Sequence, residues 1–298
     1  MKLITLNSHS IIEPDYEEKL LGFCGVVRKE QPQIMALQEV NQTISAKPAP
    51  ESCLEETGYL PCAGREDMDT AVVRVDNHAF RLAWLLKKGG YPMSWTWIPA
   101  KVGYERYDEG LALFTVWPVD DTDQFFISKT HDYHNWKTRR ALGMRIRTPE
   151  GPQWFGCVHM GWWQDEEEPF QEQWSRLSAA VSQTWLKDSQ GPAWLMGDCN
   201  SRADIRGEGY DLIRSSGWHD MYETARTKDR GDTAGGAIDG WKEGGADQGM
   251  RIDYIWCSQR ISPSVSRVIC DGINGPLVSD HYGVVMEFQN NGKEREEN

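Results

Sequence analysis

The chain has 298 residues, of which 39% are hydrophobic and 26% are charged, the usual balance of a folded globular protein rather than a disordered one. No stretch approaches the roughly 20 apolar residues that a membrane helix needs, so no membrane insertion is expected. The formal net charge of -13 argues against a broad basic face for nucleic-acid backbone, although a local basic cluster could still bind one phosphate.

The N-terminal apolar run, Leu3–Leu6, is far too short for a signal peptide and is predicted to be a first strand. Seven cysteines are spread between Cys24 and Cys270, an odd number with no CxxC pair. This distribution is not typical of a disulfide framework or a structural zinc site. Together these features predict a cytoplasmic protein.

Short apolar runs and amphipathic runs alternate along the chain. The predicted strands are Lys2–Leu6, Ile34–Gln38, Leu111–Val116, Leu142–Arg147, Trp154–His159, Ala193–Met196, Ile252–Cys257, Val265–Cys270 and Tyr282–Phe288. The predicted helices are Tyr16–Lys29, Ala79–Lys88, Phe170–Lys187 and Tyr210–Ser215. Since strands from Leu111 to His159 follow one another without helices, mixed sheets with helices outside are expected.

No repeat or long linker divides the chain, which predicts one α/β domain over residues 1–289 and a polar, flexible tail over residues 290–298. The loop Arg226–Gly249 is rich in Gly, Asp and charged residues. A loop of this length and composition is either mobile surface or an active-site lid.

Polar residues of one chemical kind stand at the ends of the predicted strands. Asn7 closes the first strand, Glu39 ends the second, and Asp198 and Asn200 follow Gly197. Asp253 interrupts a later apolar strand, and Ser279-Asp280-His281 opens the last one. Carboxylate and amide oxygens are hard ligands that suit Mg²⁺ or Mn²⁺. Each signal alone is weak, because such residues also cap helices and form turns.

In their order, these motifs resemble the endonuclease/exonuclease/phosphatase superfamily over roughly residues 1–288. That superfamily includes deoxyribonuclease I-like nucleases, abasic-site endonucleases, inositol polyphosphate 5-phosphatases and magnesium-dependent sphingomyelinases. The resemblance implies a four-layer sandwich in which two mixed β-sheets pack face to face and helices flank both. It is carried by Asn7, Gln38-Glu39, Glu109-Gly110-Leu111, His159, Gly197-Asp198-x-Asn200, Arg251-Ile252-Asp253-Tyr254 and Ser279-Asp280-His281.

The resemblance implies a divalent-metal-dependent phosphoester hydrolase in which water attacks phosphorus in line. It places Glu39, Asn7 and Asp280 on the side of the metal ion, Mg²⁺ or Mn²⁺. The residue matching Asp198 orients or deprotonates the attacking water, and Asn200 helps to hold phosphate and nucleophile.

The resemblance also implies a cationic phosphate side. His281, oriented by Asp253, would contact the phosphoryl oxygens, and His159 would be a second histidine with Glu109 as its partner. Arg139 matches a phosphate-binding arginine, and the neighbouring Lys137 is a further basic candidate. A solvated basic turn is the alternative for this pair.

The substrate is expected to be a small phosphorylated metabolite such as a sugar phosphate. The loop Gly161–Pro169 is acidic where a DNA-binding loop would be basic, and nearby aromatic residues could form a platform for a sugar ring. Those residues are Trp95, Trp97, Tyr104, Tyr107, Trp136, Trp162 and Trp163. The segments Lys101–Ala112 and His131–Arg139 also resemble a bacterial subgroup that includes a maltose 6'-phosphate phosphatase. A metal-dependent nuclease is the alternative enzyme, and a catalytically silent binding protein on the same scaffold is the third reading.

Overall fold

The computed structural model of the chain describes residues 1–62, 72–187, 191–235 and 249–288. The predicted tail over residues 290–298 lies outside these ranges, as do residues 236–248 of the loop Arg226–Gly249. The boundary predicted at residue 289 therefore stays a prediction.

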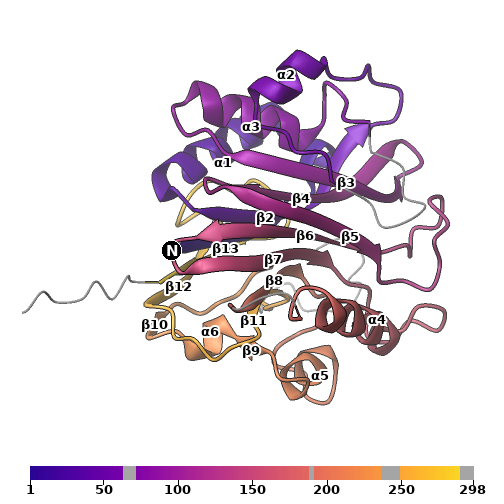
Figure 1. The fold of residues 1–298 in the computed structure, drawn as a ribbon, viewed down its shortest axis with the longest axis vertical. Helices are drawn as coiled ribbons and strands as arrows, with labels where there is room; N and C mark the ends of the chain where they lie inside the picture. Colours follow the sequence, from indigo (N-terminus) through magenta and orange to yellow (C-terminus); the bar gives the residue numbers. More distant parts are fainter. Residues whose placement is uncertain (63–71, 188–190, 236–248, 289–298) are drawn as a thin grey trace, which may run out of the picture.

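Two mixed β-sheets form the centre of the protein (Figure 1). The seven-stranded sheet contains, in spatial order, β10 (Thr227–Lys228), β12 (Val265–Ile269), β13 (Gly283–Glu287), β1 (Lys2–Asn7), β2 (Ile34–Thr43), β4 (Tyr107–Thr115) and β3 (Ser94–Gly103). The six-stranded sheet contains β5 (Val119–Phe126), β6 (Arg140–Thr148), β7 (Gly151–His159), β8 (Ala193–Asp198), β11 (Asp253–Cys257) and β9 (His219–Asp220).

Helices cover the outer side of each sheet. Figure 1 shows α1 to α3 on one side of the paired sheets and α4 and α5 on the other, which confirms the predicted four-layer α/β sandwich. The described helices are the 3-10 helix η1 (Ser10–Ile12), α1 (Tyr16–Glu30), α2 (Glu51–Glu56), α3 (His78–Lys88), α4 (Phe170–Gln183), α5 (Gly209–Ser215) and α6 (Met221–Thr224). None of these helices is long and apolar enough to cross a lipid bilayer.

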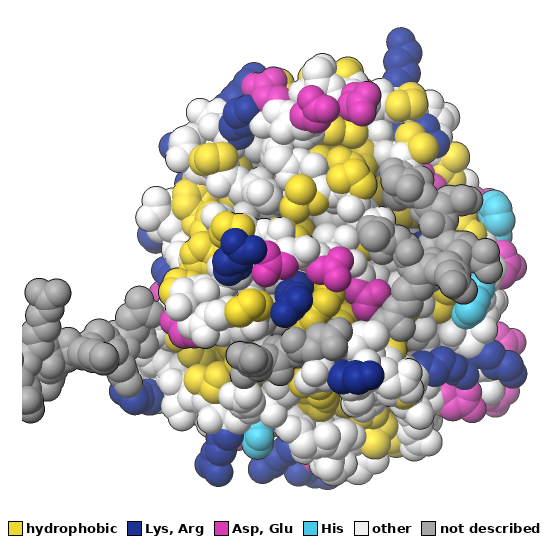
Figure 2. Space-filling view, viewed as in Figure 1, with side chains coloured by type: hydrophobic (Ala, Val, Ile, Leu, Met, Phe, Trp, Pro, Cys, Tyr) yellow, Lys and Arg dark blue, Asp and Glu magenta, His cyan; other side chains and the backbone are white. Residues whose placement is uncertain are grey.

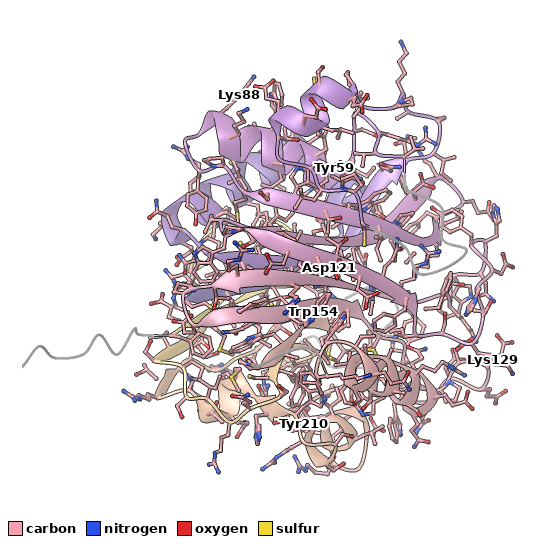
Figure 3. All side chains as sticks on the ribbon, in the orientation of Figure 1. Tyr59, Lys88, Asp121, Lys129, Trp154 and Tyr210 are labelled. Carbon is pink, nitrogen blue, oxygen red and sulfur yellow. The ribbon has the colours of Figure 1, made fainter. Side chains whose placement is uncertain are left out.

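Three apolar layers hold the four structural layers together. The middle layer lies between the sheets and includes Leu113 and Met196, one from each sheet. The outer layers lie under α1 and α3 and under α4 and α5. In Figure 3 the labelled Trp154 lies on β7, and its ring stacks on Trp185 with centroids 5.4 Å apart. Much of the tryptophan content is therefore structural, since burying an aromatic side chain removes a large apolar area from water.

Two long strands, β3 and β5, were not predicted from the sequence, and each lies at an edge of its sheet. β3 contains Pro99, which cannot donate a hydrogen bond to a neighbouring strand. β5 carries three aspartates, whose charge is tolerated because an edge strand has one side without a partner strand. The helix predicted over Phe170–Lys187 ends earlier, at Gln183. The apolar face continues to Trp185, which is wholly buried.

Candidate active site

Strand direction gathers the predicted site residues at one edge of the sandwich. Asn7 ends β1, which runs parallel to β2, and His159 and Asp198 end the parallel strands β7 and β8. Asp253 begins β11, which runs antiparallel to β8 and pairs directly with Asp198. The carboxyl ends of one set of strands and the amino ends of their antiparallel neighbours therefore meet, although the residues are far apart in sequence.

A β-bulge in β2 aims Glu39 at this edge. The pairing with β4 shifts register between Leu37 and Val40, and Glu39 has a φ of 50° in the left-handed region. Bulges re-aim side chains next to active sites, and this strained conformation persists because both neighbouring strands hold it. Asn7 Nδ2 donates to Glu39 Oε1 at 2.8 Å and to Asp198 Oδ2 at 3.1 Å, so one amide bridges the two sheets.

Asp198 is buried at the centre of the site. Its Oδ1 accepts a hydrogen bond from the backbone N–H of Asn200 at 2.7 Å, while Asn200 Nδ2 donates to the carbonyl of Met160 at 2.9 Å. The preceding Gly197 has a φ of 141°, and a Cβ there would lie 2.0 Å from the carbonyl oxygen of Val158. Only glycine therefore allows β7 and β8 to approach closely enough to present His159 beside Asp198.

His281 and Asp253 form a buried pair next to Asp198. His281 Nδ1 lies 2.9 Å from Asp253 Oδ2, and its Nε2 lies 3.8 Å from Asp198 Oδ2. Burial by itself lowers the pKa of His281, but the charge and hydrogen bond of Asp253 and the charge of Asp198 outweigh it and raise this pKa to about 10. The imidazole is therefore a cationic donor at neutral pH.

The carboxylates of the site lie close enough to repel one another. Burial, followed by the charge of Asp253, raises the pKa of Asp198 to about 7. Burial also raises the pKa of Glu39, and the charges of Glu109 and Asp280 add to that shift. A divalent cation would relieve this repulsion, and the oxygen atoms of Glu39, Asn7 and Asp280 are ligands of the kind that suits a hard ion such as Mg²⁺.

Among the described residues, two histidine-containing groups each bring three ligand atoms to within 4.8 Å of one another. One consists of His9, Glu13 and Asp280, and the other of Asp198, Asp253 and His281. In both groups the imidazole Nδ1 is already hydrogen-bonded to a carboxylate, at 2.6 Å in His9–Glu13 and 2.9 Å in His281–Asp253. We therefore regard the Glu39 side as the better position for a cation.

The environment of His159 differs from the prediction. His159 Nε2 lies 3.6 Å from Asp198 Oδ2 and 4.0 Å from Glu39 Oε1, whereas the predicted partner Glu109 forms an ion pair with Lys101 at 3.1 Å. Burial and then the positive charges of Arg139 and Lys101 lower the pKa of His159, which keeps its ring neutral. The prediction that Glu109 partners His159 is wrong, because Lys101 occupies that carboxylate instead.

A cavity of about 260 Å³ opens on these groups. Trp136 and Trp162 contribute an aromatic pair to it, with ring centroids 5.4 Å apart, and Trp136 remains about half exposed. The cavity is lined by Glu39, Lys101, Val102, Gly103, Tyr104, Glu109, Trp136, Arg139, His159, Trp162, Asp198, Asn200, Asp280 and His281.

Other predicted substrate residues lie away from the cavity. Lys137 Nζ is paired with Asp165 at 2.9 Å and Glu167 at 3.0 Å, so the acidic loop neutralises it. Trp163 packs on Phe170 at the start of α4, and Tyr107 lies under the guanidinium of Arg106. Trp95 and Trp97 are fully buried in the core beneath α3, because their positions in β3 face the helices.

Lys101 also lines the cavity, and the sequence did not predict a role for it. It lies in β3 beside Pro99, where the pairing with β4 shifts register. A buried lysine in a strand needs a carboxylate partner, and Glu109 lies directly opposite in β4. Lys101 and Glu109 are both visible in the sequence as charged residues. Their pairing could not be predicted, because it depends on a strand pairing and a bulge that the sequence pattern does not reveal.

Comparisons with known proteins agree with this architecture. The sequence model of the Endonuclease/Exonuclease/phosphatase family matches residues 4–281. A search of the curated proteins found no match. An endonuclease/exonuclease/phosphatase family protein from Leptotrichia buccalis is 25% identical, with a TM-score of 0.79 over 97% of this chain and 99% of that chain.

Two more distant solved structures share the fold. A Bacteroides thetaiotaomicron mannosyl-6-phosphatase is 15% identical, with a TM-score of 0.64 over 96% of this chain and 98% of that chain. Truncated TDP2 from Caenorhabditis elegans is 12% identical, with a TM-score of 0.56 over 96% of this chain and 95% of that chain.

Proposed function

Because the chain belongs to the endonuclease/exonuclease/phosphatase family of metal-dependent phosphoester hydrolases, we propose that it is a phosphatase that acts on a small phosphorylated metabolite such as a sugar phosphate. The observation that carries this proposal is the shared cavity of the charged groups and the Trp136–Trp162 pair. Its volume of about 260 Å³ suits a compact substrate, and indole faces suit the apolar faces of a sugar ring.

Glu39, Asn7 and Asp280 would hold the metal ion, for which we propose Mg²⁺ or Mn²⁺. When bound, such an ion polarises the phosphoryl group and stabilises the charge that develops on the leaving oxygen. Asn7 also fixes the distance between Glu39 and Asp198, because its amide donates to both carboxylates. The Asn7 side chain therefore links Glu39, the proposed metal ligand, to Asp198, which would accept the proton of the attacking water.

Asp198 accepts the proton of the attacking water. Its carboxylate is oriented by the backbone N–H of Asn200 and by Asn7, and burial keeps its pKa near the pH at which a general base works well. Asn200 in turn is fixed by its hydrogen bond to Met160, so it can hold the phosphate beside the nucleophile.

His281 and Arg139 neutralise charge on the phosphoryl oxygens. Asp253 keeps His281 protonated and oriented, and neutral His159 supplies a further hydrogen-bonding group between Asp198 and Glu39. Fixed cationic donors in a buried site stabilise a charged transition state without having to reorganise.

A nuclease activity is the competing proposal, since the family includes nucleases. The acidic loop favours it less, because Asp165 and Glu167 neutralise Lys137, a basic residue next to Trp136. On the face drawn in Figure 2, Lys and Arg side chains are interspersed with Asp and Glu rather than gathered in a basic band.

A phosphate-release screen with Mg²⁺ or Mn²⁺ over sugar phosphates, inositol phosphates and nucleotides tests the proposal, with plasmid nicking measured at the same enzyme concentration. Release from a phosphosugar with intact plasmid is expected. Trp162→Ala should raise KM for that phosphosugar more than it lowers kcat, whereas Trp84→Ala on α3 should change neither. Nicking without phosphate release would overturn the proposal in favour of a nuclease.

We propose a reducing, cytoplasmic location for the protein. None of the seven cysteines, all of which lie in the described residues, takes part in a disulfide, and six of them are buried. Buried thiols pack as small apolar groups and need no disulfide to stabilise this fold. Fractionation of the cells that produce the protein tests the location, and recovery from an oxidising compartment would contradict it.

A further inference from the structure

We propose that Lys101 binds the phosphoryl group together with Arg139 and makes the site selective for phosphate monoesters over diesters. This inference rests on the proposed function and narrows its substrate class. It assigns a role to a buried cation that the mechanism above does not use.

A second β-bulge puts Lys101 into the site. Up to Pro99, alternate residues of β3 face the helices, as Trp95 and Trp97 do, or the facing sheet, as Ile98 does. The register shift between Pro99 and Lys101 reverses this alternation, so that Lys101 lies opposite Glu109 on the inner side. Lys101 is consequently 6% exposed and lines the cavity with Asp198 and His281.

Glu109 holds this lysine in place. The Lys101 Nζ to Glu109 Oε1 distance is 3.1 Å, and both side chains are largely buried. Gly103 leaves the room that the carboxylate needs, because a Cβ at Gly103 would lie 2.9 Å from Glu109 Oε2. A buried cation is costly without a partner, and one carboxylate oxygen leaves part of the ammonium's donor capacity for a ligand.

Arg139 is the second cation of the same cavity lining. It is 5% exposed, and its Nε is buried with no hydrogen-bond partner among the described residues. The charges of Lys101 and Arg139 lie close enough to repel, which lowers the pKa of Lys101 in addition to the larger effect of burial. Two neighbouring buried cations and an unused N–H are the features of an anion site.

The number of donors favours a monoester. A monoester phosphoryl group has three terminal oxygens and up to two negative charges, whereas a diester has two such oxygens and one charge. Lys101, Arg139 and His281 together supply three charged donors, one for each terminal oxygen of a monoester. A diester has only two such oxygens, so it leaves one of these donors without an anionic acceptor. Losing one charge-assisted hydrogen bond costs roughly tenfold to hundredfold in binding or rate.

The test compares p-nitrophenyl phosphate with bis(p-nitrophenyl) phosphate in Mg²⁺ or Mn²⁺. Lys101→Gln alone leaves Glu109 buried and unpaired and can fail to fold, so Lys101→Gln/Glu109→Gln is the main variant, because it replaces the ion pair with two amides. Lys101→Arg retains the charge, and Lys88→Gln is the matched control, since Lys88 (labelled in Figure 3) is an exposed residue at the end of α3.

The wild type should prefer the monoester. The double variant should lower kcat/KM for the monoester by roughly tenfold to hundredfold and for the diester by less than about threefold. The Kd of inorganic phosphate, measured by calorimetry in Mg²⁺, should weaken by a similar factor, and Lys101→Arg should recover part of both losses. Lys88→Gln should match the wild type.

Equal losses on both esters, an unchanged phosphate Kd, or a wild type that prefers the diester would each overturn the role of Lys101. These outcomes are separate from the failure of the proposed function. A protein that cleaves p-nitrophenyl phosphate but no phosphosugar would contradict the proposed substrate, while its Lys101 variants would still decide the inference.

Discussion

Asp253 is buried behind His281, and one of its oxygens lies 2.9 Å from the imidazole. The carboxylate opposes the effect of burial, which alone would lower the pKa of His281. The positive charge of His281, which is proposed to contact the phosphoryl oxygens, therefore depends on Asp253.

We expect Asp253→Asn to reduce kcat by about 10²–10⁴-fold, the range typical of losing a positioned acid or base. Wild-type activity should fall as the pH rises through about 10, where His281 loses its proton. In the variant this alkaline loss should begin at a lower pH, because burial then acts without the opposing carboxylate. The check is a kcat pH profile beside the exposed control Asp204→Asn, and an unmoved alkaline limb would contradict the assigned role.

His78 gives a pH dependence of stability away from the site. It begins α3, its Nδ1 lies 3.0 Å from the Tyr16 hydroxyl, and burial followed by the charge of Arg81 lowers its pKa to about 3. The unfolded chain binds a proton at this side chain below about pH 6.5, whereas the folded protein does not. The contribution of neutral His78 to the free energy of unfolding is therefore fully present above about pH 6.5, and it is lost as the pH falls from about 6.5 toward 3.

Between pH 7 and pH 5 this linkage should cost about 2 kcal/mol of unfolding free energy. His78→Gln, which retains a hydrogen-bonding group for Tyr16, should show a decrease smaller by that amount. Denaturant unfolding at both pH values measures it, with His134→Gln on the exposed surface as the control. The same decrease in wild type and His78→Gln would show that other groups carry the acid sensitivity.

At the scale of elements, the sequence predicted the interior strands and the order of the site motifs, but not the edges of the sheets. β1, β7 and β8 are apolar runs buried on both faces and are recognisable as such, whereas β3 contains a proline and β5 is acidic. Glu39 could be predicted because it follows an apolar run. Lys101 could not be assigned, because its direction depends on a bulge that only the pairing with β4 defines.

The close approach of β7 and β8 provides a test at this scale. Gly197→Ala would place a methyl group 2.0 Å from the Val158 carbonyl in a backbone conformation that L-residues rarely adopt. We expect a loss of about 2 kcal/mol or more of unfolding free energy, and lower activity because Asp198 is displaced.

The matched control is Gly25→Ala in α1, where an added Cβ meets nothing within 4 Å. That change should stabilise the helix by about 0.5–1 kcal/mol. Chemical unfolding of the two variants should therefore give opposite signs. A neutral effect of Gly197→Ala would mean that the strands can separate without cost.

At the scale of the whole molecule, several acidic side chains lie close together at the edge where the two sheets meet. Glu39 is partly buried close to the charges of Glu109 and Asp280, and these interactions act with burial to raise its pKa. Such a group destabilises the metal-free protein and is expected to stabilise the protein once a cation binds. The site thus exchanges stability for binding, as functional sites commonly do.

Metal binding should therefore be visible as thermal stability. At a hundredfold excess over Kd, a ligand that binds only the folded state contributes about 2.7 kcal/mol, which corresponds to a rise in Tm of roughly 4 °C for a chain of 298 residues. We expect this rise for the wild type on adding Mg²⁺ or Mn²⁺ after chelator treatment. The control Glu17→Gln, on the exposed start of α1, should show the same rise.

The Tm of Glu39→Gln should differ from that of the wild type in chelator and in metal, and in opposite directions. In chelator its Tm should equal or exceed that of the wild type, because a neutral amide removes the repulsion with Glu109 and Asp280 and still bonds to Asn7. With metal its Tm should rise by much less, since the proposed carboxylate ligand is lost. If metal raised the Tm of Glu39→Gln as much as that of the wild type, the cation would bind elsewhere. If the Tm of Glu39→Gln in chelator were lower than that of the wild type, the charge of Glu39 would already be compensated within the folded chain.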